Sequence, residues 1–222
     1  MIAAVIFDCD GVLVDSEVLA HEVETEVLDS IGLHYHRHEF TTRFMGMSEK
    51  AFYAALDADG MARLGRSIVE EIRPRINAGM RKAVTERLRE VPGALRAVSA
   101  VSQAKAVASS STARGLDIKL RKTGLYERFA PHIYSAEEVT HAKPAPDLFL
   151  HAASALTIEP AQCLVIEDSV NGVLAARAAG MRVWGFAGGG HMTEQVTVRL
   201  GEAGAERIVA DWAAAESLLA AL

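Results

Sequence analysis

Six short apolar runs, separated by stretches with helical periodicity, constrain the fold of this chain more than any other feature of its sequence. The runs are Ala3–Phe7, Lys105–Ala108, His132–Ser135, Cys163–Glu167, Arg182–Phe186 and Arg207–Val209. Most of them lack polar alternation, which is typical of strands buried on both faces of a parallel sheet. Strands that alternate with helices form βαβ units. We therefore predict an α/β fold, an open parallel sheet inside an αβα sandwich.

Helical patterns fill the intervals between these runs. Apolar residues recur at helical spacing in Ala94–Val101, Gly115–Thr123, Asp147–Leu156 and Val170–Ala179. The Ala- and Leu-rich segment Ala213–Leu222 predicts a further helix, which packs on its own core or on a partner chain. The sequence leaves that choice open, and the expected state is a monomer or a small homo-oligomer.

Residues 16–90 interrupt this rhythm, because they carry helical patterns and no convincing strand. Three helices are predicted there: Glu17–Ile31, Glu49–Leu56 and Ala62–Arg73. Pro74 is expected to kink or end the last of them. A helical block placed after the first strand indicates an inserted α-helical cap domain. The expected domains are a core of residues 1–15 and 91–222 and a cap of residues 16–90.

Two aspartates directly follow the first apolar run, in the sequence AVIFDCDGVLVDS. On an extended chain the side chains of Asp8 and Asp10 point to the same side, and Gly11 lets the chain turn away. Ligands of open α/β sheets bind at this end of the strands. Two carboxylates this close repel each other unless a cation such as Mg²⁺ lies between them. The alternative is a pair of turn or capping aspartates.

Other predicted strands also end in chemically active residues. The sequence AVASSST ends in hydroxyl side chains, among them Ser109 and Ser110. The sequence VIEDS carries Glu167 and Asp168, and Lys143 stands before two prolines in HAKPAPD. Together these strand ends offer a carboxylate nucleophile, ligands for a metal ion, and donors for phosphoryl oxygens. Phosphoryl transfer is the chemistry that needs this combination.

In order and spacing, these motifs resemble those of the haloacid dehalogenase superfamily of phosphohydrolases. The family's four motifs correspond here to Asp8-x-Asp10-Gly11-Val12-x-x-Asp15-Ser16, Ser109, Lys143 and Glu167-Asp168. The resemblance extends over essentially the whole chain and implies a Rossmann-like core. The helical insert is similar to the cap of the subfamily that contains phosphoglycolate phosphatase, small sugar phosphatases and β-phosphoglucomutase.

The resemblance implies a catalytic role for each core motif. Asp8 attacks phosphorus and forms an aspartyl phosphate. Asp10 protonates the leaving oxygen and then deprotonates the water that hydrolyses the intermediate. Ser109 and Lys143 bind the phosphoryl oxygens, and the backbone N–H of Ser110 donates to the same group.

The same resemblance implies a magnesium site. Asp8 and Asp168 supply carboxylate ligands, and Asp10 supplies its backbone carbonyl. Glu167 is counted with this metal cluster, where it is expected to orient ligands or water.

The cap is expected to set the choice of substrate. The sequence RFMGMSEK, residues 43–50, resembles the cap segment that reaches toward the active site in this subfamily. In the β-phosphoglucomutase pattern an arginine binds the substrate's second phosphate where this chain has Glu49, which would repel a bisphosphate. His21 lies one residue, or ~100° of helix, away from the position of a mutase histidine. Arg43, His21 and Lys50 are the candidate substrate-binding residues, and solvated charges are the alternative for Arg43 and Lys50.

Composition bounds the remaining possibilities. The 222 residues carry a formal net charge of −6 and no basic stripe, which argues against a nucleic-acid partner. No apolar run approaches the ~18–20 residues that cross a membrane, and the N-terminal residues do not resemble a signal peptide. Cys9 and Cys163 form no disulfide or zinc pattern, so a cytoplasmic setting is expected.

These observations predict a Mg²⁺-dependent phosphatase that hydrolyses a small phosphomonoester, a sugar or sugar-acid phosphate. One alternative is a β-phosphoglucomutase-like phosphosugar mutase. A second alternative, from a different class, is a phosphate-binding regulatory protein without turnover. The sequence does not name the substrate, because pocket shape depends on the cap.

Overall fold

The computed structural model describes residues 1–44, 47 and 49–221. Within this range, residues 37, 38 and 42 are described by their backbone alone. The described chain divides into two compact units. We call Met1–Glu17 with Leu88–Leu222 the core unit, and Val18–Arg87 the helical unit. No helix among the described residues combines the length and the apolar character that a membrane crossing requires.

The core unit is built on a six-stranded parallel sheet with the strand order β3-β2-β1-β4-β5-β6. The strands are β1 (Ala4–Phe7), β2 (Ala104–Ser109), β3 (Ile133–Ser135), β4 (Cys163–Glu167), β5 (Arg182–Phe186) and β6 (Arg207–Val209). The six predicted strands and the predicted parallel α/β fold are therefore confirmed. The strand order reverses between β1 and β4, and this is the point at which such sheets bind ligands.

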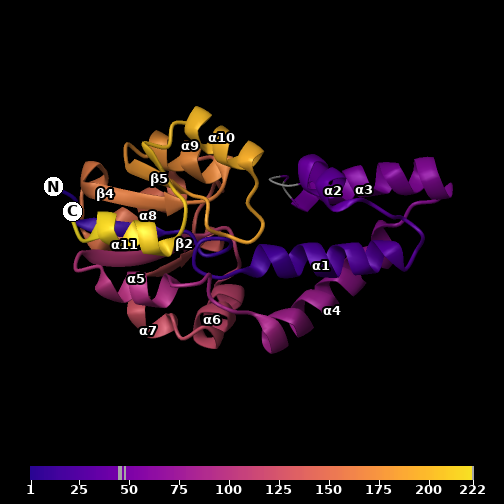
Figure 1. Ribbon diagram of the computed structural model, residues 1–222, viewed down its shortest axis with the longest axis horizontal. Helices are drawn as coiled ribbons and strands as arrows, with labels where there is room; N and C mark the ends of the chain where they lie inside the picture. Colours follow the sequence, from indigo (N-terminus) through magenta and orange to yellow (C-terminus); the bar gives the residue numbers. More distant parts are fainter. Residues whose placement is uncertain (45–46, 48, 222) are drawn as a thin grey trace. The chain divides into compact units, whose positions relative to one another are not determined.

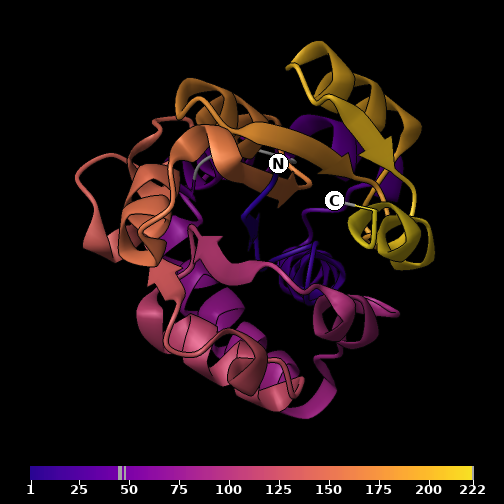
Figure 2. The ribbon, with the colours of Figure 1, turned by 90° about the vertical axis from the view of Figure 1, so that its left-hand side faces the viewer.

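Helices cover both faces of this sheet (Figure 1). One face carries α8 (Asp147–Leu156), α9 (Val170–Ala178) and α10 (Glu194–Glu202). The other carries α5 (Ala94–Ala100), α6 (Ala113–Lys122), α7 (Tyr126–Phe129) and α11 (Trp212–Leu219). Two short 3₁₀ helices, Ala136–Glu138 and Pro160–Gln162, complete the unit. Both chain ends belong to the core unit and lie close together in Figures 1 and 2.

Alternate residues of β1 pack against helices on the two opposite faces of the sheet. Ala4 and Ile6 join the cluster beneath α8 and α9, whereas Phe7 packs against Phe129 and Trp212 on the opposite face. All four residues of β1 are buried, which explains why the run has no polar alternation. Burial on both faces fixes the end of β1, and with it the place where Asp8 emerges.

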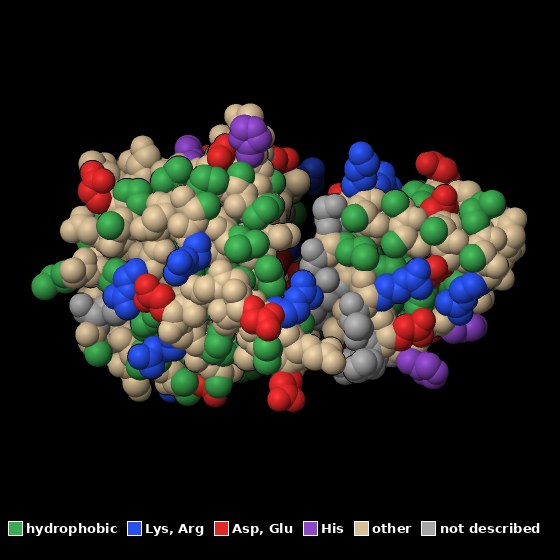
Figure 3. Space-filling model, turned by 90° about the horizontal axis from the view of Figure 1, so that it is seen from above, with side chains coloured by type: hydrophobic (Ala, Val, Ile, Leu, Met, Phe, Trp, Pro, Cys, Tyr) green, Lys and Arg blue, Asp and Glu red, His purple; other side chains and the backbone are tan. Residues whose placement is uncertain are grey.

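The surface of the core unit has mixed charge. Figure 3 shows one face of the core unit, in the left-hand part of the picture. Basic and acidic side chains are interspersed on this face, and neither sign of charge forms a continuous patch. That face therefore lacks the basic stripe on which nucleic-acid binding depends.

The described residues of the helical unit form four helices, the first of which begins in the core unit. They are α1 (Ser16–Asp29), α2 (Arg37–Phe44), α3 (Glu49–Leu64) and α4 (Val69–Arg87). Helix α2 was not predicted, because it has eight residues and its sequence offers a single apolar pair at helical spacing, Phe40 and Phe44. Residues 45, 46 and 48 of the expected substrate-reaching segment lie outside the described residues.

The prediction of a helix over Ala62–Arg73 was wrong. Gly65, with φ of 72°, adopts the left-handed conformation just after α3 ends, which is typical of a helix C-terminus. Helix α4 then begins at Val69 and continues through Pro74, contrary to the expected kink or end. Pro74 lies in the second turn, where it removes one helical hydrogen bond. We attribute the tolerance of that loss to the buried face formed by Ile72 and Ile76.

Candidate active site

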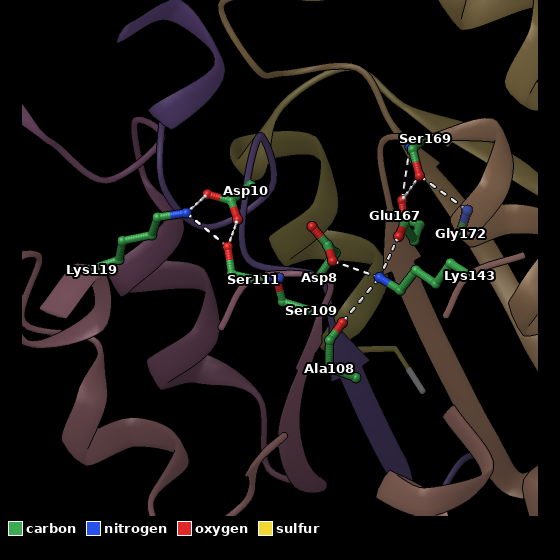
Figure 4. Close-up of polar contacts among 10 residues, drawn as sticks. All are labelled: Asp8, Asp10, Ala108, Ser109, Ser111, Lys119, Lys143, Glu167, Ser169 and Gly172. Atoms are coloured by element: carbon green, nitrogen blue, oxygen red, sulfur yellow. Dashed lines mark hydrogen bonds and ion pairs between the residues drawn. The ribbon is translucent and has the colours of Figure 1, made fainter. Parts of the chain in front are cut away.

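The polar residues of the core motifs converge at the carboxyl ends of three neighbouring strands, β2, β1 and β4. Asp8 follows β1, Ser109 ends β2, and Glu167 ends β4. Figure 4 shows that Lys143 reaches in between Asp8 and Glu167 from the loop before α8. These residues lie at the point where the strand order reverses, so the fold explains their convergence.

Lys143 binds two carboxylates at once. Its Nζ donates to Asp8 Oδ1 at 2.6 Å, to Glu167 Oε1 at 2.7 Å and to the Ala108 carbonyl at 3.1 Å. The Lys143 side chain is 4% exposed. Burial lowers its pKa, but Asp8 and Glu167 outweigh that effect and raise the pKa above its ordinary value. Lys143 therefore remains a cation in this buried position.

The carboxylate of Asp8 carries an incompletely balanced charge. Burial raises the pKa of Asp8 well above its ordinary value, and Lys143 only partly opposes this effect. Glu167 and Asp168 raise the pKa further because their negative charges are close. A second cation beside Asp8 would relieve this imbalance.

Three carboxylates gather where such a cation would bind. One oxygen each of Asp8, Glu167 and Asp168 lies within 4.8 Å of the others, and all three residues are buried. Burial raises the pKa of Asp168 to about 6, opposed by a hydrogen bond from His191 and increased by Glu167. Oxygen ligands with excess negative charge match a hard divalent cation such as Mg²⁺. The residues present therefore fit the metal ion that the sequence predicts.

Glu167 is held in place by the start of helix α9. Its Oε2 accepts hydrogen bonds from the backbone N–H and the hydroxyl of Ser169, at 2.8 and 2.9 Å. Gly172 leaves room for this carboxylate, since a Cβ at that position would lie 1.8 Å from Glu167 Oε1. Because Oε1 also accepts from Lys143, both oxygens of Glu167 are engaged by the protein. This geometry favours an orienting role for Glu167, which stays a proposal.

Gly172→Ala should destabilise the protein because the new methyl group displaces Glu167 from Lys143. We expect the free energy of unfolding to fall by about 1–3 kcal/mol, as measured by urea unfolding. Gly201→Ala in α10 is the matched control, because a Cβ there meets no atom within 4 Å. Helix propensity alone predicts that the free energy of unfolding of the control variant rises by roughly 0.5–1 kcal/mol. Equal effects at the two positions would contradict the packing of Glu167 against Gly172.

Asp10 belongs to a second polar cluster beside the first. Its Oδ1 accepts from Lys119 Nζ at 2.5 Å and from the Ser16 hydroxyl, and its Oδ2 accepts from the Ser111 hydroxyl at 2.7 Å. Burial acts to raise the pKa of Asp10, but Lys119 and these hydrogen bonds outweigh it and lower the pKa. In Figure 4 Asp10 points toward Lys119 and Ser111, whereas Asp8 points toward Lys143. The two aspartates of the first motif therefore have different partners.

The two serines expected to bind phosphate differ in exposure. Ser109 is buried, and its Oγ accepts a hydrogen bond at 3.1 Å from the backbone N–H of Ser111. Ser110 is exposed. Ser135, at the end of β3, donates its hydroxyl to the Ser111 carbonyl at 2.8 Å, which fixes the loop after β2. The loop is therefore anchored by protein contacts at the site.

The three candidate residues of the helical unit have local environments of their own. Arg43 Nη2 pairs with Asp59 Oδ1 at 2.5 Å, and Asp59 also accepts from the Tyr35 hydroxyl. The His21 ring lies 5.0 Å from the Phe40 ring, centroid to centroid. Lys50 is exposed at the start of α3. A substrate-binding role for Arg43, His21 and Lys50 stays a proposal.

Two residues at this site have contacts that the sequence did not predict: Lys119 was assigned no role, and His191 was considered only for a contact with substrate. Lys119 lies two turns into α6, three residues after the buried Leu116, and only the folded chain shows that it reaches Asp10. His191, in the glycine-rich loop after β5, contacts Asp168 at 3.0 Å. The glycine run GFAGGGH marks this loop as one that approaches other backbone closely, which is the one signal the sequence offers.

Comparison with known proteins gives a consistent family. A model of the haloacid dehalogenase-like hydrolase family matches residues 2–180 of the chain. Hexitol phosphatase B of Escherichia coli K12 is 32% identical over 188 residues, which cover 82% of this chain and 82% of that protein. The 6-phosphogluconate phosphatase of the same strain is 27% identical over 190 residues, covering 86% of this chain and 85% of that protein. Both relatives are named for phosphatase activity.

Solved structures agree with this relationship. A conserved haloacid dehalogenase-like protein of unknown function from Agrobacterium tumefaciens superposes with a TM-score of 0.89 at 34% identity, covering 100% of this chain and 99% of that one. A haloacid dehalogenase family hydrolase from Deinococcus radiodurans, with bound phosphate and sodium, gives a TM-score of 0.85 at 34% identity. That match covers 99% of this chain and 96% of the other.

Proposed function

The chain belongs to the haloacid dehalogenase-like hydrolase family, and from this premise we propose that it is a Mg²⁺-dependent phosphatase of small phosphomonoesters. The substrate class we propose is a sugar or sugar-acid phosphate, hydrolysed through an aspartyl phosphate. The observation that carries this proposal is the buried Asp8 carboxylate, bonded to Lys143 and flanked by Glu167 and Asp168. The names of the two phosphatase relatives support the substrate class.

In the first half of the proposed reaction, an Asp8 oxygen attacks phosphorus. The bond from phosphorus to the leaving oxygen breaks, and Asp10, which has to take up a proton before this step, donates that proton to the leaving oxygen. Lys143 and the Ser109 hydroxyl bind the phosphoryl oxygens, so that charge developing on them meets donors fixed by the fold. Mg²⁺, held by Asp8, Asp168 and the Asp10 carbonyl, would offset negative charge on the carboxylate and the phosphoryl group.

In the second half, a water molecule attacks phosphorus and the bond to Asp8 breaks. Asp10, now a carboxylate, takes the proton of that water, and inorganic phosphate leaves. Asp10 must therefore exchange protons at two different oxygens, so its orientation matters in both steps. We propose that the helical unit acts as the cap that admits substrate and controls access of water.

Lys119→Met should slow turnover, because Asp10 loses the ion pair that orients its carboxylate. We expect kcat to fall by about 10- to 100-fold, with little change in KM. Lys119 also lowers the pKa of Asp10, so its loss raises that pKa. Whichever limb of the kcat–pH profile Asp10 governs should therefore move to higher pH.

Two further variants complete the Lys119 measurement. Lys119→Arg keeps the positive charge and should restore part of the rate. Lys122→Met, at the exposed end of the same helix, should leave the profile unchanged. An unaltered kcat–pH profile in the Lys119→Met protein would contradict the role of Lys119 in orienting Asp10.

The experiment that tests the proposed function is a phosphate-release screen over sugar, sugar-acid and glycolate phosphates. Each ester is assayed with Mg²⁺ and with a chelator. Chelator-sensitive release from one or a few esters is the expected result and names the substrate class. Absence of release from every ester would contradict the phosphatase. A mutase assay with β-glucose 1-phosphate and a bisphosphate would follow, and Glu49 argues against a positive result there.

A further inference from the structure

The loop after β5, residues 187–191, docks onto the loops that follow β1 and β4. The backbone N–H of Gly190 donates to Asp15 Oδ1 at 3.2 Å, and His191 Nε2 lies 3.0 Å from Asp168 Oδ2. The side chains of His191 and Asp168 are each 8% exposed. The proposed reaction assigns no task to this loop or to the buried histidine in it.

Close backbone packing holds the histidine ring against Asp168. A Cβ at Gly11 would lie 1.9 Å from Asp168 Oδ2 and 2.6 Å from His191 Cε1. A Cβ at Gly189 would lie 2.6 Å from both the Gly11 carbonyl oxygen and His191 Cε1. Side chains are therefore excluded at both glycines, and this exclusion leaves the ring and the carboxylate in direct contact.

The polar contacts of the His191 ring show which residue of the site it binds. Its Nε2 meets the Asp168 carboxylate, and its buried Nδ1 has no hydrogen-bond partner in the part of the chain that the structure describes. A ring this buried does not offer a surface to substrate. Asp168 is therefore the residue through which we expect His191 to act on the site.

We propose that His191 is a positioning residue for the divalent cation: its Nε2–H binds Asp168 Oδ2 and so holds the carboxylate whose other oxygen would bind the metal ion. This inference rests on the metal site of the proposed function. A carboxylate bonded at one oxygen has already lost rotational freedom, so less conformational entropy is lost when the cation binds. Partners that orient ligands in this way typically contribute about 10- to 100-fold to metal affinity.

Mg²⁺ titration by calorimetry, on protein without substrate, tests this role directly. His191→Leu should weaken Mg²⁺ binding by about 10-fold or more. His191→Gln should retain most of the affinity, because its amide nitrogen can take the place of Nε2 and donate to Asp168. His191→Asn removes that reach and should behave like His191→Leu. His151→Leu, which changes a half-exposed ring near Glu138, is the control and should bind Mg²⁺ as the wild type does.

The comparison of glutamine with asparagine keeps the test valid if His191→Leu does not fold. Equal Mg²⁺ affinity in the glutamine and asparagine variants, or wild-type affinity in a folded His191→Leu protein, would overturn the proposal. Wild-type protein that binds no Mg²⁺ would overturn it together with the metal site. Wild-type protein that binds Mg²⁺ but hydrolyses no ester would contradict the phosphatase alone, and the variants would still test His191.

Discussion

Asp8→Asn should abolish phosphate release while leaving the protein folded. An amide does not form the bond to phosphorus that the carboxylate forms, so we expect kcat to fall by roughly four orders of magnitude or more. Lys143 keeps two of its three acceptors in this variant, Glu167 Oε1 and the Ala108 carbonyl. The buried cation is therefore not left without a partner.

Thermal unfolding separates this loss of activity from a loss of structure. The pKa of Asp8 is raised in the folded protein, so the stability that its protonation provides is full below the unfolded pKa and is lost as pH rises through the folded pKa. Keeping Asp8 ionised therefore costs stability at higher pH, and a neutral amide removes that cost. The Asp8→Asn protein in chelator should melt no lower than the wild type.

The control for Asp8→Asn is the same substitution at an exposed position. Asp117→Asn on α6 breaks only a surface pair with Arg121 and should leave activity unchanged. An Asp8→Asn protein that releases phosphate at a rate near the wild-type rate would exclude Asp8 as the nucleophile.

Lys143→Met should destabilise the protein more than Gly172→Ala does. It removes the cation between Asp8 and Glu167 and leaves two buried carboxylates close together. Breaking a buried pair in this way costs about 3–5 kcal/mol, which urea unfolding in chelator would measure. Activity should also be lost, because the phosphoryl group loses a charged donor.

The pH dependence and the double variant identify the cause of that loss. Without Lys143, which lowers the pKa of Asp8, the folded-state pKa of Asp8 rises further, so the loss of stability should be smallest at low pH and grow as pH rises. Adding Glu167→Gln to Lys143→Met should recover part of the stability, since one of the buried charges is removed. Lys122→Met should change the free energy of unfolding by less than about 0.5 kcal/mol. Additive effects of the two substitutions would contradict the charge argument.

The sequence predicts the core unit well because its signals are local. The run before Asp8 is apolar without alternation and ends in charged residues, so the pattern alone places both the strand and its end. The run Cys163–Glu167 matches β4 residue for residue for the same reason. Once the strand ends are placed, the rules of open α/β sheets bring Asp8, Ser109 and Glu167 together.

The helical unit and the second polar cluster depend on information that periodicity does not contain. The helix expected over Ala62–Arg73 continues a good pattern across Gly65, and only the left-handed backbone at that glycine ends it. Lys119 resembles an ordinary helical lysine in the sequence, since its partner Asp10 lies 109 residues away. His191 is likewise buried by contacts between three loops. Such residues are found by packing and not by pattern.

Chemical trapping of Asp8 tests the central claim most directly. The enzyme would be mixed with Mg²⁺ and p-nitrophenyl phosphate, a general phosphomonoester, then quenched in acid and treated with borohydride. Borohydride reduces an acyl phosphate to an alcohol, so peptide mass spectrometry should find homoserine at position 8 and unmodified Asp10. Turnover of the ester with Asp8 unmodified at every quench time, or with the modification at another carboxylate, would contradict the aspartyl-phosphate mechanism.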